Sequence, residues 1–420
     1  MLKFRESENS LLYRYFFVIK SKCSGDASIV YKYPLESEVP GYILNNLYDI
    51  AFVIPNGHTL PSNPSVHCSI YVSESGEQLY SFVIQNPSEK STAVVFISEF
   101  YHPRVFYQIF FSLSRPYDEN QLKIFQTEPF LKSSYDVVYS LAIPDFPSII
   151  NLSNKSEIAQ MQRFFLSNFP PYYIPQLITT LLLDSRIYVV SSSFSLLSSA
   201  VFSILSLMDP LNLKGKVIPL LTQSGLDTLT SEGSLIIGVH SSFLSDLEKI
   251  RSPSDVVFNV DEPYMACKKA PVYSDEVIEV FSGFQNVISS FCKHSKPAFP
   301  AAFVSQEIHH LVITLIAAFF DMKNTSFSSI CEEWNLRVSQ QSHNYDVMIS
   351  KSFLMRQLMD ESSKQNCSPE FLEAFWPDGT ADKRATRKKA MTISLGRIPK
   401  SKRVESRAQK EGFLSRLFTK

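Results

Sequence analysis

The chain has 420 residues, a formal net charge of −1, 45% hydrophobic residues, and 33 phenylalanines against only 12 glycines. This apolar fraction excludes a globally disordered chain, and the near-neutral charge excludes a general nucleic-acid binder. Neither the G-x-x-x-x-G-K-[ST] pattern nor the G-x-G-x-x-G pattern that cradles phosphates is present, so we expect no bound nucleotide and no other cofactor.

The first part of the chain, residues 1–118, is predicted to be a small α+β domain. Runs rich in aromatic and β-branched residues predict strands at 13–22, 28–35 and 92–100, and two alternating runs within 67–85 predict a β-hairpin. An apolar run at 49–57 ends in a turn signal, and 102–115 has a helical pattern with Pro103 in its first turn. Strands followed by a helix indicate an antiparallel sheet covered by helices.

The middle of the chain has a different pattern. Clusters of Pro, Asn, Asp and Ser predict a partly structured linker at 119–160, and short continuous apolar runs then alternate with helical segments. Continuous runs indicate strands buried on both faces, so residues 161–270 are predicted to form an α/β layer sandwich. Its predicted strands are 186–190, 217–221, 234–239 and 255–261, and its predicted helices are 174–183, 194–208 and 243–250.

The last part of the chain is predicted to be a helical region, 271–379, followed by a basic tail, 380–420. Helical patterns lie at 274–294, 305–322 and 345–363, and the apolar run 311–320 is about half the length that spans a bilayer. Residues 381–420 contain 13 Lys or Arg and 3 Asp or Glu, a net charge of +10, which leaves −11 on the rest. So much like charge with so little apolar surface predicts a disordered tail.

Cysteine and histidine spacing gives no sign of a metal site. The six cysteines form no C-x-x-C pair, and the adjacent His309 and His310 point in different directions on a helix. Scattered free thiols are typical of a reducing compartment, and charges interrupt the N-terminal segment before a signal-peptide core can form. We therefore expect a cytoplasmic protein without a metal.

Serine, histidine and acidic side chains follow the predicted strands of the α/β region, where open sheets bind ligands. They are Ser191, Ser192 and Ser193, then Thr222, Gln223 and Ser224, then His240, Ser241 and Ser242, and finally Asp261 and Glu262. A catalytic triad is disfavoured because no glycines flank the triple serine and His240 precedes Asp261. Ser241 or Ser242 is also a good N-cap for the helix at 243–250. Three interpretations stay open: capping and packing, a partner-contact surface, and a triad.

The order of these segments resembles that of DENN-domain proteins. The central matches are Asp184, Arg186-Ile187, the triple serine, "IPLL" at 218–221 and "LIIGVHSS" at 235–242. Upstream, "IVYKYPLESEVP", "FVIPNG" and "SGEQLYSFVI" resemble that family's first segments. The resemblance covers roughly 15–265 well, and 300–376 more loosely.

The resemblance implies a longin-like N-terminal lobe and an α/β layer-sandwich lobe with appended helices. It also implies guanine-nucleotide exchange on a Rab-type small GTPase, held between the lobes, in membrane trafficking. Such a protein has no covalent chemistry, metal or cofactor. Two alternatives stay open: an adaptor that binds the GTPase without exchange, and a folliculin-like GTPase-activating protein that uses an arginine such as Arg104 or Arg115.

Two candidate surfaces follow. The GTPase is expected to touch the helix near Arg104 and the strand ends, through Arg104, Tyr107, Gln223, Ser224, His240, Ser241, Ser242, Asp261 and Glu262. The tail is interpreted as a solvated segment, an intramolecular clamp on the acidic body, or a contact with an anionic membrane. The membrane contact would use Lys388, Lys389, Lys402, Arg403, Phe413, Leu417 and Phe418.

Overall fold

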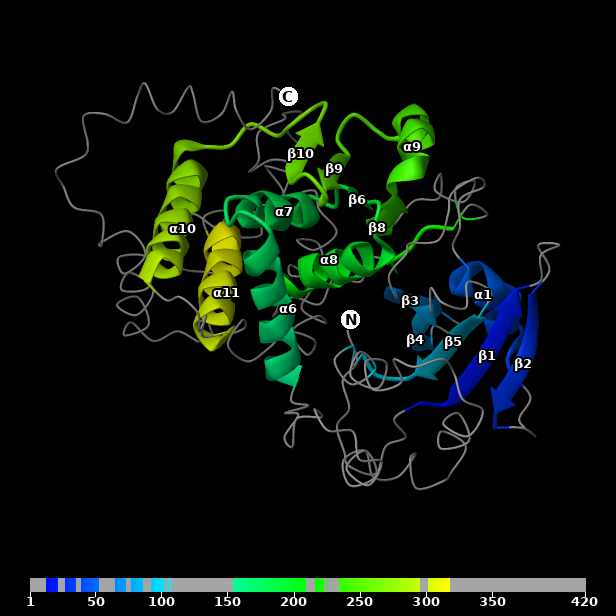
Figure 1. Cartoon of the computed structure of the whole chain (residues 1–420). Coiled ribbons are helices and arrows are strands. Elements are labelled where there is room, and N and C mark those ends of the chain that lie inside the picture. The colour runs from blue at the N-terminus through cyan, green and yellow to red at the C-terminus, as the bar shows by residue number, and fades with distance from the viewer. Residues whose placement is uncertain are drawn as a thin grey trace, which may run out of the picture. The chain divides into compact units, whose positions relative to one another are not determined.

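The computed structural model describes residues 13–21, 27–34, 39–52, 65–72, 77–85, 92–101, 103, 106, 154–208, 216–222, 225, 234–294 and 301–317. They form two compact units (Figure 1). The first unit draws on 1–157, 189–202 and 216–250, and the second draws on 158–188, 203–215 and 251–420.

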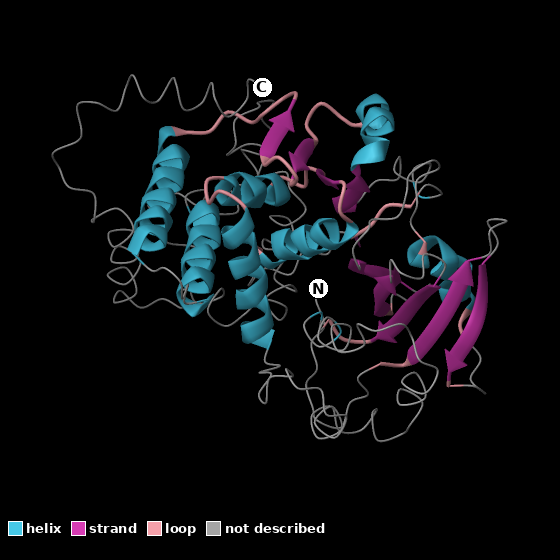
Figure 2. Ribbon diagram, in the orientation of Figure 1, coloured by secondary structure: helices cyan, strands magenta, loops and turns pink. Residues whose placement is uncertain are grey.

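The first sheet lies in the first unit and is antiparallel throughout (Figure 2). Its strands are β1 (Tyr15–Ser21), β2 (Ala27–Tyr33), β3 (Ser65–Val72), β4 (Gln78–Gln85) and β5 (Thr92–Ser98), in the order β2-β1-β5-β4-β3. The predicted hairpin is confirmed: β3 pairs with β4 from Ser65 opposite Gln85 to Val72 opposite Gln78. The prediction of an antiparallel sheet is confirmed as well.

The two faces of this sheet are covered differently. On one face lies helix α1 (Gly41–Ala51), whose Ile43, Leu47 and Ile50 follow the i, i+4, i+7 spacing of an apolar stripe. On the other face, aromatic rings pack together; Phe82 stacks on Phe106 with ring centroids 4.1 Å apart. The central strands β4 and β5 are therefore buried almost throughout.

Helix α1 differs from the sequence prediction. The run 49–57 was expected to be an apolar run ending in a turn, but its first three residues close this helix. The helix has no side-chain cap at Pro40 and no acidic residue in its first turn, so the usual start signals are missing. Tertiary packing of the apolar stripe stabilises it instead.

The second sheet is mixed and confirms the predicted strands. It contains β6 (Ile187–Ser191), β7 (Lys216–Ile218), β8 (Ser234–His240), β9 (Val256–Asn259) and β10 (Tyr264–Cys267), in the order β10-β9-β6-β8-β7. Strands β7 and β8 are parallel, whereas β9 and β10 form an antiparallel hairpin. Strand β10 was not predicted, because its four residues are partly exposed and show no buried run.

The helices agree with the predictions in type and differ at their ends. They are α6 (Asn154–Asn168), α7 (Tyr173–Leu182), α8 (Phe194–Ser206), α9 (Leu244–Ile250), α10 (Asp275–His294) and α11 (Ala301–Ala317). Helix α6 begins inside the range predicted as linker. All ten residues of α7 are buried, as the sequence predicted for this helix. The predicted helix at 345–363 lies outside the described residues, and in 102–115 only Pro103 and Phe106 are described, both helical. Within the described part of the chain, no helix is long and apolar enough to cross a bilayer.

Candidate functional site

Strand β8 is held close to the segment that follows β7, and Gly238 makes this approach possible. A Cβ atom at position 238 would lie 2.0 Å from the carbonyl oxygen of Pro219, closer than any side chain tolerates. The N–H of Leu221 donates to the carbonyl of Gly238 at 2.7 Å, which fixes this approach. The glycine is therefore required where the backbone after β7 closely approaches that of β8.

His240, the last residue of β8, begins the turn that leads into α9. The N–H of Ser242 donates to His240 Nδ1 at 3.3 Å, and His240 Nε2 lies 3.2 Å from the carbonyl oxygen of Ser192. A carbonyl only accepts, so the ring carries its proton on Nε2 and accepts at Nδ1. The histidine is the N-cap of the 3₁₀ turn Ser241–Phe243. The sequence predicted a serine cap for the helix at 243–250; the structure adds a cap by the imidazole on the 3₁₀ turn that precedes this helix.

The same geometry disfavours a catalytic triad. The hydroxyl of Ser242 lies 2.8 Å from His240 Nδ1, but that nitrogen already accepts from the backbone N–H of the same serine. The other ring nitrogen is bound to a backbone carbonyl, where a triad would have a carboxylate. Only 8% of His240 is exposed, so the ring offers little surface to a substrate. The arrangement is a cap of a strand-to-helix turn.

A second histidine, His67 of strand β3, is fully buried in the first unit. Its Nε2 donates to the carbonyl of Ile50 at 2.9 Å, and the amide of Gln85 donates to the carbonyl of Ala51. These carbonyls belong to the last turn of α1 and have no partner within the helix, so the two side chains complete its C-terminus. Burial lowers the pKa of His67 to about 4, although the hydrogen bond to Ile50 acts in the opposite direction.

Phe194, the first residue of α8, lies between the two histidines. Its ring centroid is 5.9 Å from that of His67 and 4.8 Å from that of His240. The next residue, Ser195, accepts a hydrogen bond from the N–H of Val66 at 3.0 Å. The first turn of α8 thus contacts both β3 and the end of β8.

The turn between β9 and β10 carries two predicted contact residues, Asp261 and Glu262, and both are exposed. Their N–H groups donate to the side-chain oxygen of Asn259, at 3.0 Å and 3.2 Å, which shapes the turn. Ser241 and Ser242 are half-buried. Four of the predicted GTPase contacts lie outside the described residues: Arg104, Tyr107, Gln223 and Ser224. All seven predicted membrane contacts of the tail, and Arg115, lie outside them too.

Comparison with known families assigns the central part of the chain. Residues 89–262 match the model of the DENN (AEX-3) domain. The chain carries a DENN domain. The match begins just before β5 and ends in the turn after β9, so it includes the capped end of β8. No curated protein matches the chain.

The DENN match confirms the central resemblance seen in the sequence. Its motif residues occupy defined places: Asp184 adopts a positive φ of 54° just before β6, and the triple serine precedes α8. Residues upstream of 89 lie outside the match, so for them the family assignment stays a prediction.

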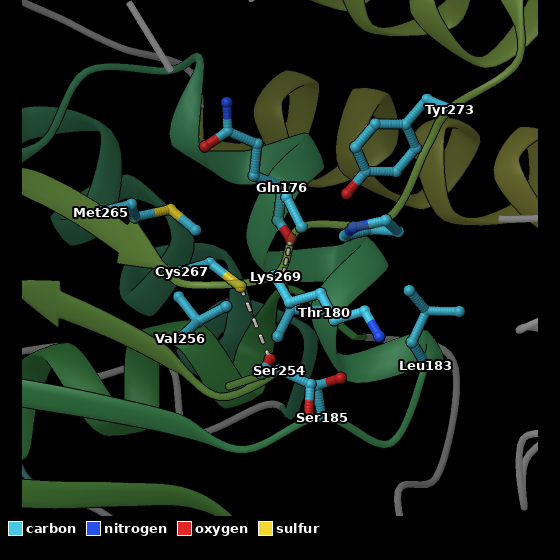
Figure 3. Close-up of a pocket in the computed structure, with 12 residues that line it drawn as sticks. Gln176, Thr180, Leu183, Ser185, Ser254, Val256, Met265, Cys267, Lys269 and Tyr273 are labelled. Atoms are coloured by element: carbon cyan, nitrogen blue, oxygen red, sulfur yellow. Dashed lines mark hydrogen bonds between the residues drawn. The ribbon is translucent and has the colours of Figure 1, made fainter. Parts of the chain in front are cut away.

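A small cavity lies in the second unit, beside helix α7 and the β9–β10 hairpin (Figure 3). Its lining includes Gln176, Thr180, Val256, Cys267 and Tyr273. Its volume of about 30 Å³ is similar to the volume that one water molecule occupies in liquid water. The cavity is therefore too small for a nucleotide or an organic cofactor.

Two ionisable groups of this cavity, the Cys267 thiol and the Tyr273 hydroxyl, keep their protons at neutral pH. Burial raises the pKa of the Cys267 thiol, and it raises the pKa of Tyr273 to about 12. A thiol that keeps its proton is a poor nucleophile. Among the described residues, no group of three or more His, Cys, Asp or Glu could hold a metal ion.

Proposed function

We propose that this protein is a guanine-nucleotide exchange factor that promotes GDP release from a Rab-type small GTPase in membrane trafficking. The observation that carries the proposal is the DENN domain at 89–262, since DENN domains are associated with nucleotide exchange on GTPases. We further propose that the first sheet and α1 form a longin-like lobe. The site of action would be the cytoplasm, with peripheral attachment to trafficking membranes.

Exchange requires a shaped surface and no reactive group. A surface that binds the nucleotide-free GTPase more tightly than the loaded one weakens nucleotide binding by the same factor. The described strand ends suit such a role, because His240 and Ser242 are held in a cap, and Asp261 and Glu262 are exposed on a turn that hydrogen bonds to Asn259 shape. The proposed contact surface therefore comprises Ser241, Ser242, Asp261 and Glu262, with Arg104, Tyr107, Gln223 and Ser224 as further members. The buried ring of His240, which was also predicted as a contact, supports this surface by capping the turn.

The activity is tested with the full chain and a panel of Rab-type GTPases loaded with fluorescent GDP. Catalytic amounts of the protein should accelerate GDP release from at least one of them, with a GTPase of another family as control. Tight binding with unchanged release would support the adaptor instead. Faster phosphate release from GTP-loaded protein would support a GTPase-activating protein.

The contact surface is tested by charge reversal. We expect Glu262→Lys to slow GDP release at least tenfold, because repulsion or loss of a charge pair at a contact acts directly on binding. The matched control is Glu279→Lys, an exposed acidic residue on α10 that is not among the predicted contacts. Equal loss of activity in both variants would exclude a specific role for the β9–β10 turn.

A further inference from the structure

Three buried rings form a continuous row of tilted ring contacts inside the first unit. Phe194 lies between the imidazoles of His67 and His240, and the exposed fractions of the three residues are 4%, 0% and 8%. The three rings come from different elements: β3, the start of α8 and the end of β8. Aromatic rings hold a fixed geometry because few rotamers fit a close-packed interior.

Hydrogen bonds hold each of the elements that contribute these three rings. His67 donates to Ile50 at the end of α1, and His240 donates to the carbonyl of Ser192 just before α8. Between them, the N–H of Val66 donates to the hydroxyl of Ser195. Strand β3 is an edge of the first sheet, so its outward N–H groups need partners from elsewhere, and α8 supplies one for Val66.

We propose that His67, Phe194, Ser195 and His240 form a joint that positions the Ser241-Ser242 turn relative to the first sheet, and that nucleotide exchange depends on it. The inference rests on the proposed function and assigns positioning residues to its contact surface. The joint residues are buried or half-buried and act through the turn that they orient. A loosened joint lets this turn shift, which lowers the rate of exchange because a preorganised surface is lost.

The first test measures mechanical coupling without any GTPase. Ser195→Ala removes the acceptor of the Val66 N–H, and hydrogen exchange should then speed up in β3 and also at residues 240–250, on the far side of Phe194. The matched control is Ser206→Ala in the same helix, whose hydroxyl donates to the carbonyl of Ser203 three residues before it. Faster hydrogen exchange confined to β3 would overturn the proposal of a joint.

The second test links the joint to nucleotide exchange on the GTPase. Ser195→Ala should lower the maximal rate of GDP release about fivefold, the effect of one lost hydrogen bond, while Ser206→Ala leaves the rate unchanged. Ser195→Thr keeps the hydroxyl and should restore the rate. Wild-type release in Ser195→Ala, despite faster hydrogen exchange at 240–250, would overturn the positioning role.

The two tests separate the joint from the proposed function. Absence of release from any GTPase by the wild-type protein would refute the exchange proposal, whereas hydrogen exchange would still decide whether the joint exists. Should Ser195→Ala fail to fold, Phe194→Leu serves in its place, because it removes the ring that contacts both histidines and replaces none of the hydrogen-bonding groups of the joint. Propagation to 240–250 in that variant supports the joint, and its absence contradicts it.

Discussion

At the scale of single residues, His67 makes stability depend on pH. Its pKa is about 4 in the folded protein and about 6.5 in an unfolded chain, so the unfolded state binds more protons between these values. The free energy of unfolding should therefore be highest above pH 6.5 and fall as the pH falls from 6.5 to 4. The total loss from this residue is roughly 3 kcal/mol.

Denaturant unfolding at pH 7.5, 6 and 5 measures this loss. The variant His67→Gln keeps a donor for the Ile50 carbonyl and removes the ionisable ring. Its free energy of unfolding should therefore fall less steeply than that of the wild type as the pH falls. Parallel curves for the wild type and the variant would contradict the prediction.

His240 is the residue for which the structure most changes the sequence-based expectation. Its position at the end of a strand was predicted, and so was a capping role for this region. The partners of the cap, Ser192 and Phe194, lie 48 and 46 residues away in the sequence, so no local pattern reveals them. The burial of the ring follows from these long-range contacts. The role of His67 could not be predicted for the same reason, because its partner in α1, Ile50, is 17 residues away in the sequence.

We expect His240→Ala to destabilise the fold by roughly 2 kcal/mol, because it removes the cap and leaves the Ser192 carbonyl and the Ser242 N–H without this partner. Thermal unfolding measures the loss. The matched control is His310→Ala, an exposed position on α11, which should change stability little. A variant as stable as the wild type would place the ring at the surface, as a contact of the GTPase.

At the scale of elements, the parallel pair β7–β8 depends on one glycine. Gly238→Ala should cost roughly 3 kcal/mol, because the added methyl group would press on the Pro219 backbone, which cannot move away like a flexible side chain. The control is Gly41→Ala at the start of α1, where nothing lies within 4 Å and stability should be kept or slightly raised. Equal midpoints of denaturation for the two variants would contradict this account.

The elements that the sequence predicted share one property, which is a strong local pattern. Buried strands such as β6 have short apolar runs rich in β-branched residues, and the hairpin β3–β4 has alternating runs joined by a turn signal, and both patterns are typical of strands. Helix α1 and strand β10 lack such signals, because α1 has no capping residue and β10 is short and partly exposed. Both are defined by what they pack or pair with, α1 against the sheet and β10 against β9.

At the scale of the whole molecule, charge separates the tail from the rest. A tail of +10 beside a remainder of −11 predicts attraction to an anionic membrane or to the protein itself. Under the membrane interpretation, the full chain should sediment with vesicles rich in phosphatidylserine at low salt, and deletion of 381–420 should prevent it. Vesicles of neutral lipid are the control.

The same deletion distinguishes the intramolecular clamp. If the tail covers the GTPase site, its removal should accelerate GDP release in the absence of vesicles. Unchanged sedimentation and unchanged release would together leave the tail as a solvated segment.

The interleaving of the two units has a consequence for the growing polypeptide. The five strands of the first sheet are complete once residue 98 has been made, but the helix that supplies Phe194, Ser195 and Phe202 to this unit comes about a hundred residues later. At usual rates of translation this interval lasts roughly 5 to 20 s. During it, strand β3 and the rings of Tyr80 and Tyr101 lack the partners that α8 gives them. Newly made chains therefore expose an aggregation-prone sheet edge while they are on the ribosome, and a chaperone that binds at this stage would cover it.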